Sequence, residues 1–176
     1  MQDEQLFRKV YEDHAEMGYN LCLNYLQNPE DAEEASQDVF VKVHGQLAKF
    51  AGRSSLKTWI YRIAVNQCLD HLKARKRQKR DGIHVPIFPF GTSNPVLAGN
   101  FRHPGVQLED KEATERIFRY INELPAKQKT ALILKTLEGL PQQEIAEIMK
   151  MSVKAVESLL SRARSNLKKK LKKSEG

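Results

Sequence analysis

A stretch rich in proline and glycine, residues 81–112, divides this chain of 176 residues into two parts. It holds four of the seven prolines and four of the nine glycines, and its apolar residues follow neither a helical nor a strand period. Such a stretch breaks helices and strands alike. The sequence therefore predicts two small modules, 1–80 and 113–176, joined by a linker over 81–112. The apolar run 85–90 within it is expected either to dock on the front module or to enter a groove of a partner.

The two modules differ in charge. Residues 1–72 carry seven basic and eleven acidic side chains, whereas 73–80 carry six basic and no acidic ones. Residues 113–176 carry fourteen basic and seven acidic side chains, and the whole chain has a net charge of +7. Six cations in eight residues are more than a helix dipole attracts to a helix end. The run 73–80 therefore predicts contact with nucleic-acid phosphates.

The sequence argues against several classes of protein. No segment approaches the roughly 20 consecutive apolar residues that cross a bilayer, and the polar start is unlike a secretory signal. Cys22 and Cys68 are too few for a disulfide framework or a thiolate zinc site. Cys68 and His71 are interpreted as a buried thiol beside a surface imidazole. Without a paired-histidine motif, a phosphate loop or a nucleophile elbow, we expect a cytoplasmic non-enzyme that needs no metal or cofactor and does not insert into membranes.

Outside the linker the apolar residues recur at helical spacing. One helix is expected to begin near Asn28, a plausible N-cap, with Pro29 at its first position and an apolar stripe over 32–47. The opposite face holds Glu34, Gln37, Asp38 and Val41. Acids alone would suit a solvated surface, but Val41 among them favours a docking face for a protein.

A second front helix is predicted over about 55–77, after a loop that contains Gly52 and two serines, one of which is expected to cap the helix. It has two apolar stripes, so we expect it to be buried on more than one side. Trp59 and Tyr61 are open to two interpretations: they are core aromatics, or they are exposed and stack on single-stranded bases.

The rear module is predicted to hold four helices, at about 110–123, 126–137, 141–149 and 153–172. Pro125 and Pro141 suit first turns, and Gly139 suits a helix end. Only Lys150, Met151 and Ser152 join the last two helices, which indicates a helix-turn-helix, with an ordinary helical hairpin as the alternative. Ser152 is expected to cap the last helix. Lys150 stands where glycine is usual, and a left-handed conformation there costs about 1–2 kcal/mol.

The exposed side of the last predicted helix is polar and basic. It offers Lys154, Ser158, Ser161, Arg162 and Ser165, followed by a lysine-rich tail. Such a helix suits the major groove, with its N-terminal part near base edges and its lysines on phosphates.

Together these motifs resemble those of the extracytoplasmic-function sigma factors, small members of the bacterial sigma-70 family. The matching segments are Asp31–Val43, Phe50, Gly52 and Leu56–Asn66 in front, and Leu124-Pro125, Glu144-Ile145-Ala146, Met151-Ser152, Val156 and Arg162-Ala163-Arg164 behind. The resemblance covers nearly the whole chain. It implies an all-α fold, with a region 2 bundle of three or four helices over 1–80 and a region 4 helix-turn-helix over 113–176.

The resemblance also implies a function and its residues. Such a protein binds core RNA polymerase and directs promoter recognition and transcription initiation. Docking on the clamp helices of the largest polymerase subunit is assigned to Glu34, Gln37, Asp38 and Val41. Opening and recognition of the minus-ten element is assigned to Arg53, Ser54, Trp59, Arg62, Asn66, Lys73, Arg75 and Lys76. Recognition of the minus-thirty-five duplex is assigned to Ser152, Lys154, Ala155, Ser158, Ser161, Arg162 and Lys168. An anti-sigma partner is implied by the resemblance alone.

One segment departs from the family pattern. Residues 155–159 are Ala-Val-Glu-Ser-Leu, where many members carry Thr-Val-Lys-Ser-Arg. Glu157 repels phosphate, so the family's minus-thirty-five preference does not transfer to this chain. The alternative function is a stand-alone helix-turn-helix regulator, which would leave the acidic front helix without a role.

Overall fold

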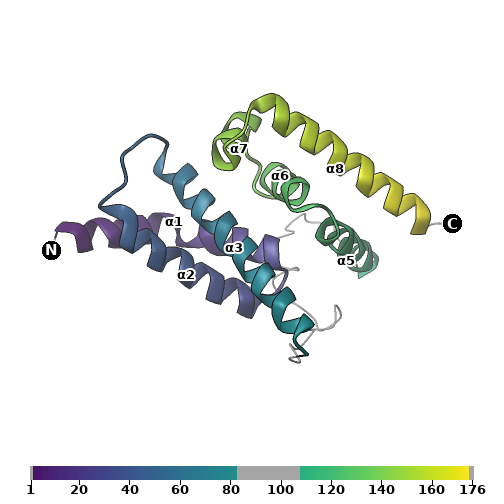
Figure 1. The fold of residues 1–176 in the computed structure, drawn as a ribbon, viewed down its shortest axis with the longest axis horizontal. Helices are drawn as coiled ribbons and strands as arrows, with labels where there is room; N and C mark the ends of the chain where they lie inside the picture. The colour runs from purple at the N-terminus through teal and green to yellow at the C-terminus, as the bar shows by residue number, and fades with distance from the viewer. Residues whose placement is uncertain (1, 83–107, 175–176) are drawn as a thin grey trace. The chain divides into compact units, whose positions relative to one another are not determined.

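The computed structural model describes residues 2–82 and 108–174. Within these ranges all regular secondary structure is helical (Figure 1), which confirms the all-α prediction. The helices are α1 (Gln2–Leu26), α2 (Pro29–Leu47), α3 (Leu56–Arg80), α5 (Leu108–Asn122), α6 (Ala126–Thr136), α7 (Gln142–Met149) and α8 (Val153–Ser174). The apolar run 85–90 lies outside the described residues.

The described helices form two compact units. Helices α1, α2 and α3 make up the first, and α5, α6 and α8 the second. Helix α7 directly precedes α8 and is described with it. Helix α5 begins at Leu108, inside the segment assigned to the linker. None of the described helices is both long and apolar enough to span a membrane.

In the first unit each helix packs against the other two. Its core holds Leu21, Cys22, Tyr25, Ala32, Val39, Val43, Ile60, Ala64 and Cys68. Helix α1, which the sequence analysis did not locate, approaches α2 closely at Gly18: a Cβ there would lie 2.9 Å from Cε2 of Phe40. The absence of a side chain at Gly18 therefore lets these helices come together.

Side-chain caps mark the starts of α2 and α3 as predicted. Asn28 has extended backbone, and its Oδ1 accepts a hydrogen bond from the Asp31 backbone N–H at 3.0 Å. Pro29 follows at the first helical position. The Ser55 hydroxyl accepts from the Thr58 N–H at 3.0 Å. Helix α3 continues to Arg80, beyond the predicted end at residue 77.

In the second unit α8 packs on α5 and α6. Its core includes Phe118, Ile121, Ile133, Leu134, Leu160 and Ala163. The Asn166 amide donates to Oε1 of the buried Gln128 at 3.0 Å, tying α8 to α6. Pro125 is the N-cap of α6, one position before the expected first turn. Gly139, with φ +68°, lies in the left-handed region just past α6, as its predicted helix-ending role requires.

The turn between α7 and α8 has the predicted form. Lys150 has φ +51°, so this lysine does adopt the left-handed conformation that glycine usually supplies. The Ser152 hydroxyl accepts from the Ala155 N–H at 3.1 Å and caps α8. Ile145, Ala146 and Val156 are buried. The three-residue turn thus sets α8 off from α7 in the manner of a helix-turn-helix.

Candidate functional site

The outward side of α2 holds the four predicted docking residues on one face. Glu34, Gln37, Asp38 and Val41 recur at helical spacing, and all four are exposed. Val41 is 71% exposed, a large value for an apolar side chain surrounded by polar ones. We call these four residues the acidic face. Its composition suits a partner that presents basic groups around an apolar contact.

A groove between α1 and α2 borders the acidic face on one side. It is lined by Phe7, Tyr11, Ala15, Glu16, Tyr19, Glu33, Ser36, Gln37, Phe40, Val41 and His44. Gln37 and Val41 belong to both the groove and the acidic face. Two of these lining residues are acidic and none is Lys or Arg. On α1, Phe7, Tyr11, Ala15 and Tyr19 recur every four residues, so aromatic side chains form one wall that extends the acidic face.

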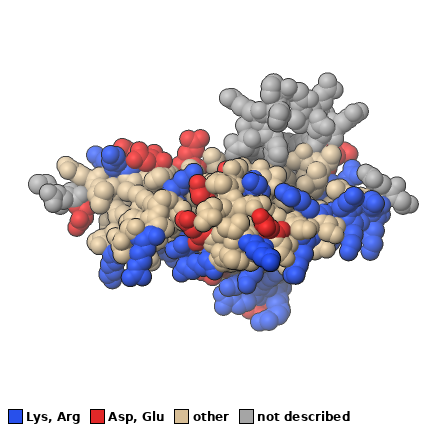
Figure 2. Space-filling model, turned by 90° about the horizontal axis from the view of Figure 1, so that it is seen from above, with Lys and Arg blue, Asp and Glu red and all other residues tan. Residues whose placement is uncertain are grey.

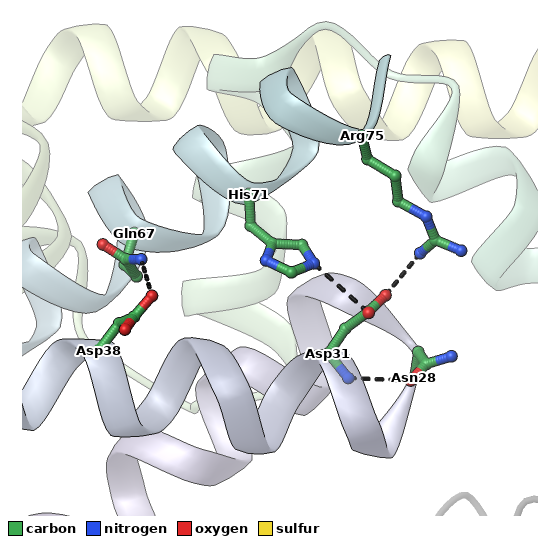
Figure 3. Close-up of polar contacts among 6 residues, drawn as sticks. All are labelled: Asn28, Asp31, Asp38, Gln67, His71 and Arg75. Atoms are coloured by element: carbon green, nitrogen blue, oxygen red, sulfur yellow. Dashed lines mark hydrogen bonds and ion pairs between the residues drawn. The ribbon is translucent and has the colours of Figure 1, made fainter. Parts of the chain in front are cut away.

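A line of polar contacts, the polar seam, joins α2 to α3 on the other side of the acidic face (Figure 3). Near the start of α2, Asp31 accepts from Arg75 Nη1 at 2.6 Å and lies 3.4 Å from His71 Nε2. Further along, Oδ2 of Asp38 accepts from Gln67 Nε2 at 2.8 Å. Lys42 Nζ donates to the other end of the same Gln67 amide. Asp38 is therefore both a member of the acidic face and a link to α3.

Helix α3 carries a row of polar residues on its outward side. Arg62, Asn66, Lys73, Arg77 and Arg80 recur at steps of three, four and seven, so they share one side of the helix. Arg62 is half-buried, and the other four are exposed. We call these five residues the α3 row. Lys73 lies 3.8 Å from Asp70, an exposed pair that contributes little to stability.

Arg75 lies apart from the α3 row. It points toward α2, and its guanidinium is paired with Asp31 at 2.6 Å, with the two side chains 29% and 22% exposed. Lys76 is exposed but lies to one side of the row. Among the cations predicted to bind the minus-ten element, Lys73 therefore lies in the α3 row. Arg75 instead pairs with Asp31 inside the first unit. Arg77 and Arg80 belong to the basic run 73–80 that was predicted to contact phosphates, but they were not among the residues assigned to the minus-ten element, although their spacing from Asn66 could have identified them.

The two aromatic residues with open roles differ in burial. Tyr61 is 3% exposed and belongs to the core, so the core interpretation holds for this residue. Trp59 is half-buried and packs against Phe50, with ring centroids 5.0 Å apart. Phe50 precedes the loop that carries the exposed Arg53 and the half-buried Ser54. Trp59 and Phe50 thus lie together where α3 begins, and the remaining exposed ring surface is available for stacking.

Helix α8 presents most of its predicted duplex-facing residues on one exposed side. Lys154, Ser158, Ser161, Arg162 and Lys168 are all exposed and share that side by helical spacing. Ser152 is exposed at the cap, and Ala155 is half-buried. Leu159, which replaces a basic residue of the family pattern, is half-buried.

The lysines at the end of α8 do not behave alike. Figure 2 shows Lys and Arg side chains gathered near the C-terminal turns of this helix, and Lys168, Lys169, Lys172 and Lys173 are exposed there. Lys170 instead pairs with Glu123 and lies 5.9 Å from the ring centroid of Tyr120 on α5. Four of the five tail lysines therefore face solvent, and one holds α8 to α5.

The described residues offer no cluster of three His, Cys, Asp or Glu side chains able to hold a metal ion. Both cysteines are buried thiols outside any disulfide. His71, three residues after Cys68, is half-buried and directed at Asp31 (Figure 3). The arrangement of these residues suits packing and an ion pair within the unit.

Comparison with known proteins gives two family matches in order along the chain. Residues 10–78 match the model of sigma-70 region 2, and residues 114–167 match that of sigma-70 region 4. RNA polymerase sigma-H factor of Pseudomonas aeruginosa is 33% identical over 153 residues, covering 86% of this chain and 78% of that protein. The ECF RNA polymerase sigma factor SigW of Bacillus subtilis is 28% identical over 174 residues, covering 97% of this chain and 91% of that protein.

A solved structure has the same fold. The sigma factor RpoE of Bartonella quintana, in complex with the anti-sigma factor NepR, superposes with a TM-score of 0.67 at 23% identity. The match covers 94% of this chain and 96% of that one.

Proposed function

Because this chain belongs to the sigma-70 family as an extracytoplasmic-function sigma factor, and so binds core RNA polymerase and directs transcription initiation, we propose how its surfaces divide that work. It is a transcription factor and not an enzyme. Residues 1–80 would form region 2, 81–112 the linker and 113–176 region 4. The work takes place in the cytoplasm, where bacterial polymerase meets the chromosome.

The acidic face of α2 is the docking site for core polymerase in this proposal. The observation that carries it is Val41, an apolar side chain left 71% exposed among Glu34, Gln37 and Asp38. An isolated surface would gain nothing from this arrangement, whereas a basic helical partner would bury Val41 and pair with the acids. The groove toward α1 adds aromatic surface beside it.

The α3 row and the Phe50–Trp59 pair are proposed to act on the minus-ten element. Arginine and lysine in the row neutralise phosphates, and Asn66 has the donor and acceptor needed for a base edge. A base that leaves the duplex needs an aromatic surface, which Trp59 offers beside Phe50. Arg75 is assigned to the polar seam rather than to DNA.

The exposed side of α8 is proposed to bind the minus-thirty-five duplex. Ser152, Lys154, Ala155 and Ser158 lie at its N-terminal end, where a recognition helix meets base edges. Arg162 and Lys168 lie further along, where phosphate contact adds affinity without sequence preference. We also propose an anti-sigma partner for this chain, because RpoE of Bartonella quintana has one.

Run-off transcription with purified core polymerase tests the proposal. The protein should direct RNA synthesis from specific promoters, and Glu34→Lys or Val41→Asp should weaken core binding at least tenfold, since an interfacial charge clash costs several kcal/mol. Glu12→Lys, at an exposed acid of α1 that does not line the groove, is the matched control. Asp38 is a poor test position because its loss also breaks the bond to Gln67.

The alternative, a stand-alone regulator, makes the opposite prediction for Glu34. If the protein binds a specific duplex tightly without polymerase, and Glu34→Lys leaves transcription unchanged, the assignment of the acidic face is wrong. Without polymerase, the α3 row and the exposed side of α8 are expected to bind DNA weakly and in a salt-dependent way. Tight DNA binding by the protein alone would conflict with this expectation.

A further inference from the structure

We propose that Gln67 is a positioning residue that holds the α3 row in register with the acidic face of α2. Through it, the surface that docks on polymerase and the surface that opens promoter DNA keep one fixed geometry. This inference rests on the proposed function of both surfaces, and it assigns a role to a buried amide that touches neither partner.

The contacts of Gln67 reach across the polar seam in both directions. Its side chain is 8% exposed, although it lies next to the exposed Asn66. Nε2 donates to Oδ2 of Asp38 at 2.8 Å, and Oε1 accepts from Nζ of Lys42. Figure 3 shows the amide of α3 turned toward the carboxylate of α2. One side chain of α3 thus bridges an anion and a cation one turn apart on α2.

The chemistry of the bridge suits an amide. A carboxylate only accepts hydrogen bonds and an ammonium group only donates them, so a side chain that serves both needs a donor end and an acceptor end. Both bonds involve a charged partner, which makes them stronger than neutral ones. A glutamate at this position would face Asp38 with a second carboxylate, and a leucine would make neither bond.

The position of the Gln67 bridge along the polar seam lets it orient the α3 row. The other tie, Asp31 to Arg75, lies seven residues earlier on α2 and eight residues later on α3. This is a separation of about two helical turns. The packed core already limits movement of α3 on α2, and two ties fix its rotation and register more closely than one. The Gln67 tie is the one beside Asn66 and Arg62.

Because Gln67 is buried, its substitution can affect function only through the position of α3. The side chain is covered by α2 and lies outside the α3 row, so no partner contact is lost when it is replaced. Glu34 and Val41 do not contact Gln67 through any of the bonds described above. Loss of the bridge should therefore leave polymerase docking in place and impair the step that depends on where Asn66 and Arg62 lie.

Two measurements on reconstituted holoenzyme test the proposal. Affinity for core polymerase is measured by fluorescence anisotropy, and opening of the minus-ten region by permanganate reactivity of unpaired thymines. For Gln67→Leu we expect core affinity within about twofold of the parent and opening reduced about tenfold, the factor that 1.4 kcal/mol represents. Gln46→Leu, an exposed glutamine at the end of α2, is the matched control and should change neither.

A charge-swap variant separates positioning from general weakening. Gln67→Glu should impair opening because two carboxylates then face each other. Adding Asp38→Asn should restore it, since the amide at 38 donates to the carboxylate at 67, which also pairs with Lys42. Asp38→Asn alone reports any effect of that change on docking. If Gln67→Leu does not fold, the comparison of Gln67→Glu with the double variant Gln67→Glu and Asp38→Asn still tests the proposal.

Three results would overturn the inference. The first is normal opening by folded Gln67→Leu, and the second is a double variant that opens promoters no better than Gln67→Glu. A parallel fall in core affinity, opening and melting temperature would also reject it, because Gln67 would then be a stability residue only. Failure of the parent protein to transcribe with core polymerase is a different result, which rejects the proposed function itself.

Discussion

The ion pair between Asp31 and Arg75 leads to a prediction about the role of Arg75. The sequence assigned Arg75 to DNA, whereas the structure pairs it with Asp31 within the first unit. The perturbation is a double-mutant cycle of Asp31→Ala and Arg75→Ala. If the guanidinium serves α2, the two changes will be strongly coupled in stability. If it serves DNA, they will be nearly independent.

The size of the coupling follows from the geometry. The two side chains are 22% and 29% exposed, and the Nη1 to Oδ2 distance is 2.6 Å. Fully exposed pairs contribute less than about 1 kcal/mol, whereas removal of one partner of a buried pair costs about 3–5 kcal/mol. We expect a coupling energy of about 1.5 kcal/mol for this half-buried pair. Asp31→Ala should be the costlier single change because His71 also loses its neighbour.

Urea unfolding of the full chain, followed by tryptophan fluorescence, measures the cycle. Trp59 is the only tryptophan and lies in α3, so the signal reports on the first unit. Salt-dependent DNA binding completes the test: Arg75→Ala should leave the slope of log K against log salt unchanged, while Arg77→Ala should reduce it by about one. A coupling below about 0.3 kcal/mol, or equal slope changes for the two arginines, would refute the reasoning.

Three other predictions concern stability and DNA affinity. Gly18→Ala should destabilise the first unit by about 1 kcal/mol, because its Cβ meets the Phe40 ring, and Gly45→Ala, with no atom nearby, should not; urea unfolding compares them. Lys150→Gly should stabilise the turn between α7 and α8 by about 1 kcal/mol by relieving its left-handed backbone, and a melting temperature no higher than the parent's would contradict this. Lys169→Ala should reduce the salt slope of DNA binding by about one, whereas Lys170→Ala should lower thermal stability and leave the slope unchanged.

Features governed by local chemistry were predicted well from the sequence. The caps Asn28, Ser55 and Ser152 accept the hydrogen bonds expected of them, and Gly139 and Lys150 have positive φ. Each depends on only a few neighbouring residues, which are visible in the sequence. Helix α1 was not located, although its apolar residues Met17, Leu21 and Tyr25 recur every four residues.

Features that join distant parts of the chain were not predicted. The spacing of Arg75 within a basic run gives no sign that Asp31, 44 residues earlier, is its partner. Gln67 lies in a segment where either stripe could be buried, so its role depends on how α3 is rotated against α2. Tyr61 and Trp59 were left open for the same reason, and only packing shows that one is core and the other half-buried. Pairing and rotation are tertiary properties, and periodicity alone does not determine them.

The contacts of α2 determine which residue of the acidic face can be mutated to test docking alone. This helix is buried on its core stripe, open to the groove beside Gln37 and Val41, and bonded to α3 through Asp31, Asp38 and Lys42. Reversal of Asp38 would alter docking and the seam together, so a measurement of core affinity alone would not distinguish the two effects. Glu34 belongs to the acidic face but makes none of the described contacts of the polar seam. A comparison of Glu34→Lys with Asp38→Lys therefore separates loss of docking from displacement of the α3 row: the first should reduce core affinity alone, and the second should reduce promoter opening even at saturating core polymerase.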